Sequence, residues 1–156
     1  MWASDFFSEG LGEDVLIEHN TAIPVGNSAY YIEAGTPPAL VRFRMTNNLS
    51  GFGAFGVTFP KADESLAKWV PGAIIAKNAL VNISDTGDGQ GVARNRPGDI
   101  NQGMYASFPS PAAAGVNADG TLTPTSPLRR AGADRKDIGV DFDEMQRAMT
   151  DQPLRR

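Results

Sequence analysis

The chain of 156 residues contains no cysteine and a single histidine, His19. The absence of cysteine excludes disulfide bonds, thiolate metal sites and cysteine nucleophiles. One histidine is too few for the ligand sets that zinc normally takes. A Ser-His-Asp triad would have to include His19, and no G-x-S-x-G nucleophile elbow is present. We therefore interpret His19 as a surface loop residue, and we expect no enzyme, no metal site and no cofactor.

Charge and long apolar runs are also scarce. The sequence has 14 Lys and Arg against 18 Asp and Glu, a formal net charge of −4, so a phosphate backbone gains no net attraction. No stretch approaches the roughly 20 apolar residues of a membrane span, and the first residues lack the basic start of a secretion signal. Because 41% of the residues are hydrophobic and only 21% charged, we expect a soluble, folded protein.

The N-terminal segment is acidic and aromatic. Residues 1–41 contain six acidic residues and no Lys or Arg. Trp2, Phe6 and Phe7 lie within residues 1–13, which are too few to bury three aromatic side chains on their own surface. We interpret residues 1–13 as an arm whose aromatic side chains either bind a partner or fold back onto the core of the same chain.

Residues 14–108 have the pattern of a β domain. Residues 41–46 alternate apolar side chains with Arg42, Arg44 and Thr46, which predicts a strand with one buried face. We read residues 47–51 as a turn, and residues 63–69 as a short helix. The pattern of short strands in residues 14–108 predicts a mainly β fold, namely a small antiparallel sandwich or barrel. The other predicted strands are 15–17, 29–32, 52–59, 74–75, 79–83 and 104–108.

The composition changes after Phe108. Residues 109–139 include four prolines, four glycines and only four large aliphatic residues, too few to bury a core. We therefore expect an extended arm over residues 109–140 that is ordered by a neighbour. The four aliphatic residues are Val116, Leu122, Leu128 and Ile138.

The last segment, residues 141–156, predicts a docking helix. Asp141 followed by Glu144 three residues later forms a capping box. Phe142, Met145 and Met149 then fall on one helix face. A helix of two turns with three apolar residues is not stable alone in water, so it requires a surface to dock on.

A glycine-rich loop carries two weaker motifs. Asp85-Thr86-Gly87 resembles the D-T-G of retroviral-type aspartic proteases, in which two such aspartates of a dimer share a proton. Ser84 and Asp88 depart from the pattern of that family. The loop 84–103 also holds acidic residues that could chelate Ca²⁺, but without the spacing of an EF-hand. We interpret it as an exposed turn between strands.

The basic residues occur as separate pairs rather than as a dense patch, which favours salt links and solvated faces. Residues 103–110 have the sequence Gly-Met-Tyr-Ala-Ser-Phe-Pro-Ser. This stretch resembles a strand of the SpoVG family of nucleic-acid-binding proteins, and that strand ends in an apolar residue followed by Pro and Ser. Residues 111–114 replace the basic residues expected next. The resemblance implies phosphate contacts by Arg42, Arg44, Arg94 and Arg96.

A β domain with an aromatic arm, a long Pro/Gly-rich arm and an amphipathic terminal helix resembles, in architecture, small structural proteins of tailed-bacteriophage virions. The resemblance implies a capsid decoration (cement) protein, located in the virion, that binds a major capsid protein or another virion protein and forms a homo-oligomer within the assembly. Neck or tail components share these features, and a SpoVG-like binder is the other alternative. The residues expected to bind partners are Trp2, Phe6, Phe7, Leu122, Leu128, Phe142, Met145, Met149 and Leu154.

Overall fold

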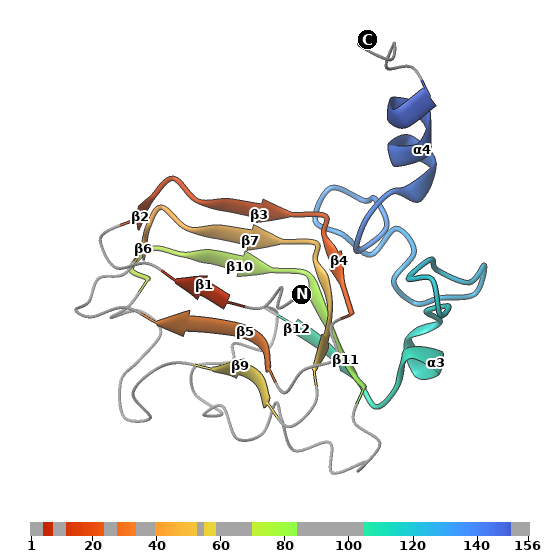
Figure 1. The fold of residues 1–156 in the computed structure, drawn as a ribbon, viewed down its shortest axis with the longest axis horizontal. Helices are drawn as coiled ribbons and strands as arrows, with labels where there is room; N and C mark the ends of the chain where they lie inside the picture. The colour runs from red at the N-terminus through yellow and green to blue at the C-terminus, as the bar shows by residue number, and fades with distance from the viewer. Residues whose placement is uncertain are drawn as a thin grey trace, which may run out of the picture.

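A computed structural model of the chain describes residues 5–7, 12–23, 28–33, 40–52, 55–58, 70–83 and 105–150. These residues form short strands followed by two helices (Figure 1). In chain order the elements are β1 (Asp5–Phe7), β2 (Gly12–Glu13), β3 (Leu16–Glu18), β4 (Thr21–Ala22), β5 (Ser28–Glu33), β6 (Leu40–Val41), β7 (Arg44–Thr46), β8 (Leu49–Phe52), β9 (Phe55–Thr58), β10 (Ile74–Ala76), β11 (Asn78–Asn82), β12 (Tyr105–Phe108), α3 (Pro111–Ala114) and α4 (Phe142–Thr150).

Successive turns of the chain lie side by side and run in the same direction (Figure 1). Leu16 of β3 pairs with Arg44 of β7, which pairs with Ile74 of β10, so residues far apart in the sequence become neighbours. In the same way, β4, β8, β11 and β12 pair in parallel within a second sheet, and β1, β5 and β9 pair in parallel within a third. This is the geometry of a parallel β-solenoid. We refer to β1–β4 as coil 1, to β5–β8 as coil 2 and to β9–β11 as coil 3.

The predicted antiparallel sandwich or barrel is wrong, although the mainly β character is confirmed. Every pairing between strands in the described residues is parallel. Alternation of apolar and polar residues reveals which face a strand buries but not the direction of its neighbour. Residues 47–51, predicted as a turn, contain a corner at Asn47 and then continue as β8. The predicted helix over residues 63–69 and the loop 84–103 lie outside the described residues.

Two sharp corners recur at the same place in each coil. At each corner one residue has a positive φ, which redirects the chain from one sheet to the next. Most of these residues are not glycine, so the conformation costs each about 1 kcal/mol, and neighbouring contacts must offset it. The first corner is formed by Asp14, Arg42 and Gly72, and the second by His19, Asn47 and Lys77.

A column of asparagine side chains follows the second corner. Nδ2 of Asn20 donates to Oδ1 of Asn48, and Nδ2 of Asn48 donates to Oδ1 of Asn78, at 3.0 and 2.9 Å. Asn48 Nδ2 also reaches the carbonyl of Ile17, and Asn78 Nδ2 donates to the carbonyl of Met45. The column therefore satisfies backbone groups that the corners release from the strand ladders.

The interior of the solenoid holds the first apolar core. Side chains from the inward positions of coils 2 and 3 form it, and Val15 and Ile17 of coil 1 pack against it. The inward positions around β7 were predicted correctly, because Phe43 and Met45 are buried while Arg44 is exposed. The buried members are Leu40, Phe43, Met45, Val70 and Ile75.

A second core lies outside the solenoid. Leu49, Ala79 and Val81 project from the outer face of the sheet that contains β8 and β11, and residues 109–140 cover them. The covering segment contributes four buried apolar residues to this core: Ala114, Val116, Leu128 and Ile138. The segment predicted as an extended arm ordered by a neighbour therefore packs on the body of its own chain.

Two glycines allow this close packing. Gly115 follows α3 with φ +64°, and a Cβ at this position would lie 2.8 Å from Ser126. Gly139 has φ +96°, and a Cβ there would lie 2.5 Å from Oγ1 of Thr21. A side chain at either position would push the covering segment away from the sheet.

Replacing Asn48 by Ala should lower the free energy of unfolding by about 3 kcal/mol, because it leaves several buried donors and acceptors unpaired. Asn20→Ala is the matched control. Its side chain is exposed at the end of the column, so the expected loss is about 1 kcal/mol or less. Urea denaturation of both variants measures the difference, and equal losses would contradict a structural role for the buried column.

Candidate partner-binding surface

Helix α4 extends away from the solenoid at the end of the described chain (Figure 1). Oδ1 of Asp141 accepts a hydrogen bond from the backbone N–H of Glu144 at 2.9 Å, which confirms Asp141 as the predicted cap. Asp143 and Glu144 lie in the first turn and Arg147 in the last, so the charges follow the helix dipole. The helix therefore has a capping residue at its start and charges at both ends that favour the helical conformation.

The apolar face of α4 is left largely uncovered. None of the residues in α4 is buried. Met145 and Met149 are 42% and 70% exposed, and Phe142 is half-buried at the base of the helix. These are the three residues that the sequence places on one face, and the structure keeps them together. Side chains of this size that stay exposed on a short helix make this face a candidate for contact with another surface.

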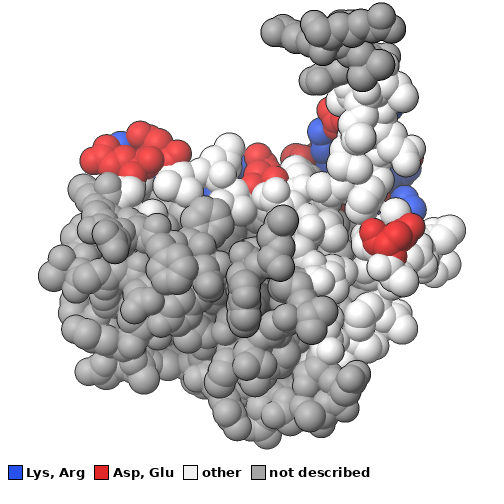
Figure 2. Space-filling model, in the orientation of Figure 1, with Lys and Arg blue, Asp and Glu red and all other residues white. Residues whose placement is uncertain are grey.

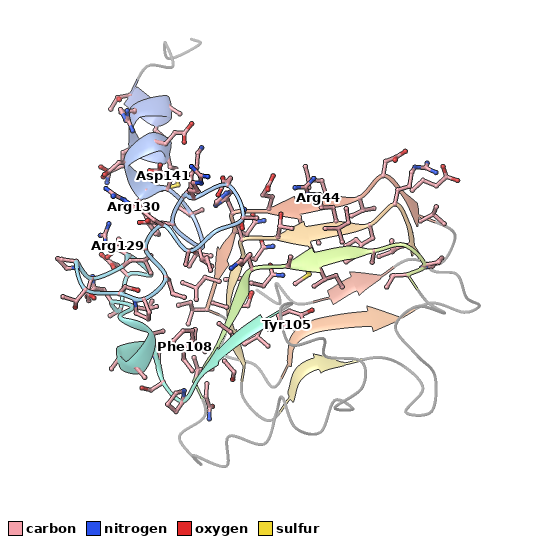
Figure 3. The ribbon with its side chains drawn as sticks, turned by 180° about the vertical axis from the view of Figure 1, so that it is seen from behind. Arg44, Tyr105, Phe108, Arg129, Arg130 and Asp141 are labelled. Carbon is pink, nitrogen blue, oxygen red and sulfur yellow. The ribbon has the colours of Figure 1, made fainter. Side chains whose placement is uncertain are left out.

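A groove with a volume of about 360 Å³ separates the base of α4 from the loops of the covering segment. Figure 3 shows Arg129, Arg130 and Asp141 close to this junction. Basic and acidic side chains share its walls, with Leu122 and Phe142 among them. Because the charges are mixed, the groove does not form a strong field of one sign.

Arg129 holds the loops in place. Its guanidinium donates to the carbonyls of Leu122 and Thr123 at 2.9 and 2.8 Å, and it forms an ion pair with Asp137 at 3.2 Å. The other carboxylate oxygen of Asp137 accepts the backbone N–H of Arg130. The guanidinium of Arg129 is thus used internally, which supports a structural role for this residue.

His19 joins the covering segment to the second corner of coil 1. Nδ1 of His19 is 3.1 Å from the carbonyl of Gly139, and Nε2 is 2.8 Å from Oδ2 of Asp134. The amide of Asn47 also contacts Nε2, and its Oδ1 accepts the backbone N–H of Ala133. The sequence indicated a surface loop residue, whereas the structure shows a half-buried corner residue with contacts 115 and 120 residues away.

The carboxylate of Asp134 is stabilised in its charged form. Partial desolvation raises its pKa, but hydrogen bonds from the backbone N–H of Lys136 and from His19 lower it more, so the pKa lies below the ordinary value. Because the pKa of Asp134 is lowered in the folded state, its contacts stabilise the fold fully at pH values above the unfolded-state pKa. This stabilisation is lost as the pH falls through the folded-state pKa.

The remaining predicted site residues lie in different places. Leu128 is buried in the second core, and Leu122 packs against it. The backbone of Phe6 and Phe7 forms β1 beside β5, and the positions of their side chains are not described. Trp2 and Leu154 lie outside the described residues. The predicted boundaries of the segments stay predictions.

The basic residues suggested by the SpoVG resemblance are divided. Arg42 forms ion pairs with Glu13 and Asp14 across the first corner, where Figure 2 shows acidic side chains gathered over β2 and β6. A hydrogen bond from the Arg42 guanidinium lowers the pKa of Asp14. Arg44 is exposed on the neighbouring sheet, while Arg94 and Arg96 lie outside the described residues. Phosphate contacts through these residues remain a prediction.

One surface feature was not predicted from the sequence, the outer face of the sheet formed by β3, β7 and β10. Leu16 and Ile74 are 60% and 53% exposed there, and Arg44 lies between them in register. We call these three residues the outer stripe. Aligning the sequences of the three coils by the residues of their first corner would have placed Leu16, Arg44 and Ile74 at equivalent positions.

Comparison of the chain with protein-family models, curated proteins and solved structures finds no match. Within the described ranges, no group of three or more potential ligands is placed to hold a metal ion. No helix in that same part of the chain is long and apolar enough to span a bilayer.

Replacing Leu128 by Ala should lower the free energy of unfolding of the isolated chain by about 3 kcal/mol, because the side chain is buried in the second core. Met149→Ala removes an exposed side chain and should change stability by no more than about 0.5 kcal/mol. Chemical denaturation compares the two. A Leu128→Ala chain as stable as the wild type would contradict the burial of Leu128 in the second core.

Asp134→Asn should destabilise the chain at neutral pH, and the difference from wild type should shrink as pH falls below about 4. The reason is that the lowered pKa of Asp134 stabilises the fold only while the carboxylate is ionised. Urea midpoints measured from neutral pH down to about pH 2.5 test this. A difference that is constant across the whole range would show that the ionisation of Asp134 contributes nothing.

Proposed function

We propose that this chain is a structural component of a larger assembly, and specifically a capsid decoration protein of the kind found on tailed-bacteriophage virions. The observation that carries the proposal is helix α4, which extends from a folded body with its apolar residues Met145 and Met149 uncovered. A short amphipathic helix of this kind is a common means of docking in a groove or on a sheet.

The parallel solenoid suits such a role. Each coil contacts its neighbours through strand ladders, and the covering segment ties coil 1 to coil 2 through the contacts of His19 and Gly139. A body whose neighbouring coils are joined in this way is expected to keep a fixed shape. A decoration protein requires this property because it holds neighbouring subunits at a fixed distance.

The packing of residues 109–140 changes how attachment is expected to work. These residues cover Leu49, Ala79 and Val81, so they are not free to run across an adjacent subunit. Attachment is therefore assigned to α4, and to the aromatic residues of the N-terminal segment, residues 1–13, as a second contact. Two weak contacts on one body bind far more tightly than either alone.

A position in the neck or tail of a virion would use the same two contacts and remains the alternative location within this class. The SpoVG-like alternative predicts binding of an oligonucleotide that weakens steeply as salt concentration rises. A decoration protein should not show this binding.

Changing both Met145 and Met149 to Ala should reduce attachment to particles at least about tenfold, because it removes the exposed apolar residues of α4. The measurement is co-sedimentation of the purified full chain with virions that lack it, quantified by mass spectrometry. Since neither residue is buried, the variant should keep its fold, which circular dichroism and denaturation can verify.

Arg147→Ala, on the opposite side of the helix, is the matched control and should attach like the wild type. Equal attachment of the double variant and the control would show that α4 is not the attachment element. Failure of the wild-type chain to bind any particle would refute the decoration role. Immunogold labelling distinguishes capsid, neck and tail positions.

A further inference from the structure

We infer that His19 is a pH-sensitive latch on the covering segment. When Nε2 of His19 carries a proton, the ring holds the segment through Asp134. When Nε2 loses that proton, the ring pairs with Asn47 of coil 2 instead, and the segment loses one of its attachments. This inference concerns how the body of the protein is held together, and it does not depend on the proposed attachment through α4.

Both nitrogens of the His19 ring face polar atoms of the same chain. Nδ1 lies 3.1 Å from the carbonyl oxygen of Gly139, and Nε2 lies 2.8 Å from Oδ2 of Asp134. The amide nitrogen of Asn47 lies 3.2 Å from the same Nε2. Because a carbonyl oxygen only accepts hydrogen bonds, the contact with Gly139 requires a hydrogen on Nδ1. The nitrogen that gains or loses a proton in this arrangement is therefore Nε2.

The two neighbours of Nε2 require opposite protonation states. The carboxylate of Asp134 only accepts, so its hydrogen bond requires a hydrogen on Nε2. The amide of Asn47 is oriented by its oxygen, which accepts the backbone N–H of Ala133 at 2.8 Å. Its nitrogen therefore faces Nε2, and because this nitrogen only donates, its hydrogen bond requires a bare Nε2. One proton thus selects between the covering segment and coil 2.

Asp134 is well placed to transmit this choice to the loop formed by residues 132–136. Its Oδ2 contacts His19, while its Oδ1 accepts the backbone N–H of Lys136 at 3.0 Å and so helps to close the loop. Opening the loop breaks the hydrogen bond of Ala133 in either protonation state. It breaks the contact between His19 and Asp134 only when Nε2 is protonated, so opening is harder in that state.

The direction of the pH effect follows from the charges. A protonated His19 lies beside the Asp134 carboxylate while the loop is closed, so the closed loop binds the proton more tightly than the open loop does. The latch is therefore strongest where His19 is protonated, and it weakens as the pH rises through the range of about 5 to 8, in which histidine side chains change charge. The pKa of Asp134 lies below its ordinary value, so its carboxylate is ionised throughout this range.

The other charged groups near the ring do not replace this pair. Within the described ranges, Asp134 forms its one ion pair with His19, and the ammonium group of Lys136 lies 3.8 Å from Glu144. Glu18, which precedes His19, accepts a hydrogen bond from Oγ1 of Thr46 at 2.9 Å and adds negative charge beside the corner. The charged residues around the ring come from coil 1, coil 3 and the covering segment, and they are Glu18, Lys77, Asp134, Arg135 and Lys136.

Nitrogen NMR of the imidazole ring tests the protonation states directly, because His19 is the only histidine in the chain. The full chain would be labelled with ¹⁵N-histidine and titrated from about pH 5 to about pH 8. Both ring nitrogens should carry a hydrogen at the lower pH, and Nδ1 alone should keep its hydrogen at the higher pH. A neutral ring that keeps its hydrogen on Nε2 would overturn the inference.

Hydrogen exchange of the Ala133 amide measures the opening of the loop. After correction for the intrinsic pH dependence of exchange, its protection should be about threefold higher at pH 5 than at pH 8. The expected effect is modest because the side chains of His19 and Asp134 are 23% and 38% exposed. The amide of Val140, which donates to Oγ1 of Thr21, should show no such difference and serves as the internal control.

Two variants should abolish the pH dependence of Ala133 protection, His19→Asn and Asp134→Asn. His19 has φ +53°, and Asn47 occupies the equivalent corner of coil 2 with φ +61°, so asparagine fits the backbone at position 19. The matched control is Asp137→Asn, which weakens a different contact of the covering segment, the ion pair with Arg129. This variant should loosen the segment but keep the pH dependence.

The inference is overturned if the Ala133 amide of the wild-type chain is equally protected at pH 5 and pH 8. It is also overturned if the difference persists in His19→Asn, since a group other than His19 would then be responsible. Neither experiment measures attachment to particles, so the latch and the proposed function can fail separately.

Discussion

The asparagine column at the second corner is the interaction on which the rest of the structure depends. A parallel solenoid must turn sharply between sheets, and each turn releases backbone groups that the strand ladders cannot pair. Asn48 and Asn78 supply those partners while stacking on each other, so the corners of neighbouring coils are held in register. Register at the corner then sets register in the two sheets that meet there.

The second core follows from that register. Leu49 and Ala79 come directly after the asparagines of the column, so they face outward one above the other on the adjoining sheet. An exposed apolar surface of this kind would favour aggregation. Residues 109–140 cover it, anchored by the contacts of His19 and Gly139 beside the same corner. The sheet and its cover are therefore mutually dependent, although they are far apart in the sequence.

Local patterns predicted the strands and the terminal helix, but not how they assemble. The alternation around Phe43 and Met45 and the cap at Asp141 are encoded within a few residues, and both are confirmed. Direction and pairing depend on a long repeat in which few positions are identical and the step varies between coils. The low count of aliphatic residues in 109–139 was misleading, because they complete a core whose other half belongs to β8 and β11.

The two cores also explain which apolar side chains remain exposed on α4 and on the outer stripe. The solenoid interior and the covered sheet have taken up most of the apolar side chains of the described residues, and the polar corners close the remaining edges. Leu16, Ile74 and Met149 stay exposed where no further described segment covers them. The covering segment is used to bury one sheet face, so the exposed side chains of α4 and of the sheet formed by β3, β7 and β10 have no covering counterpart among the described residues.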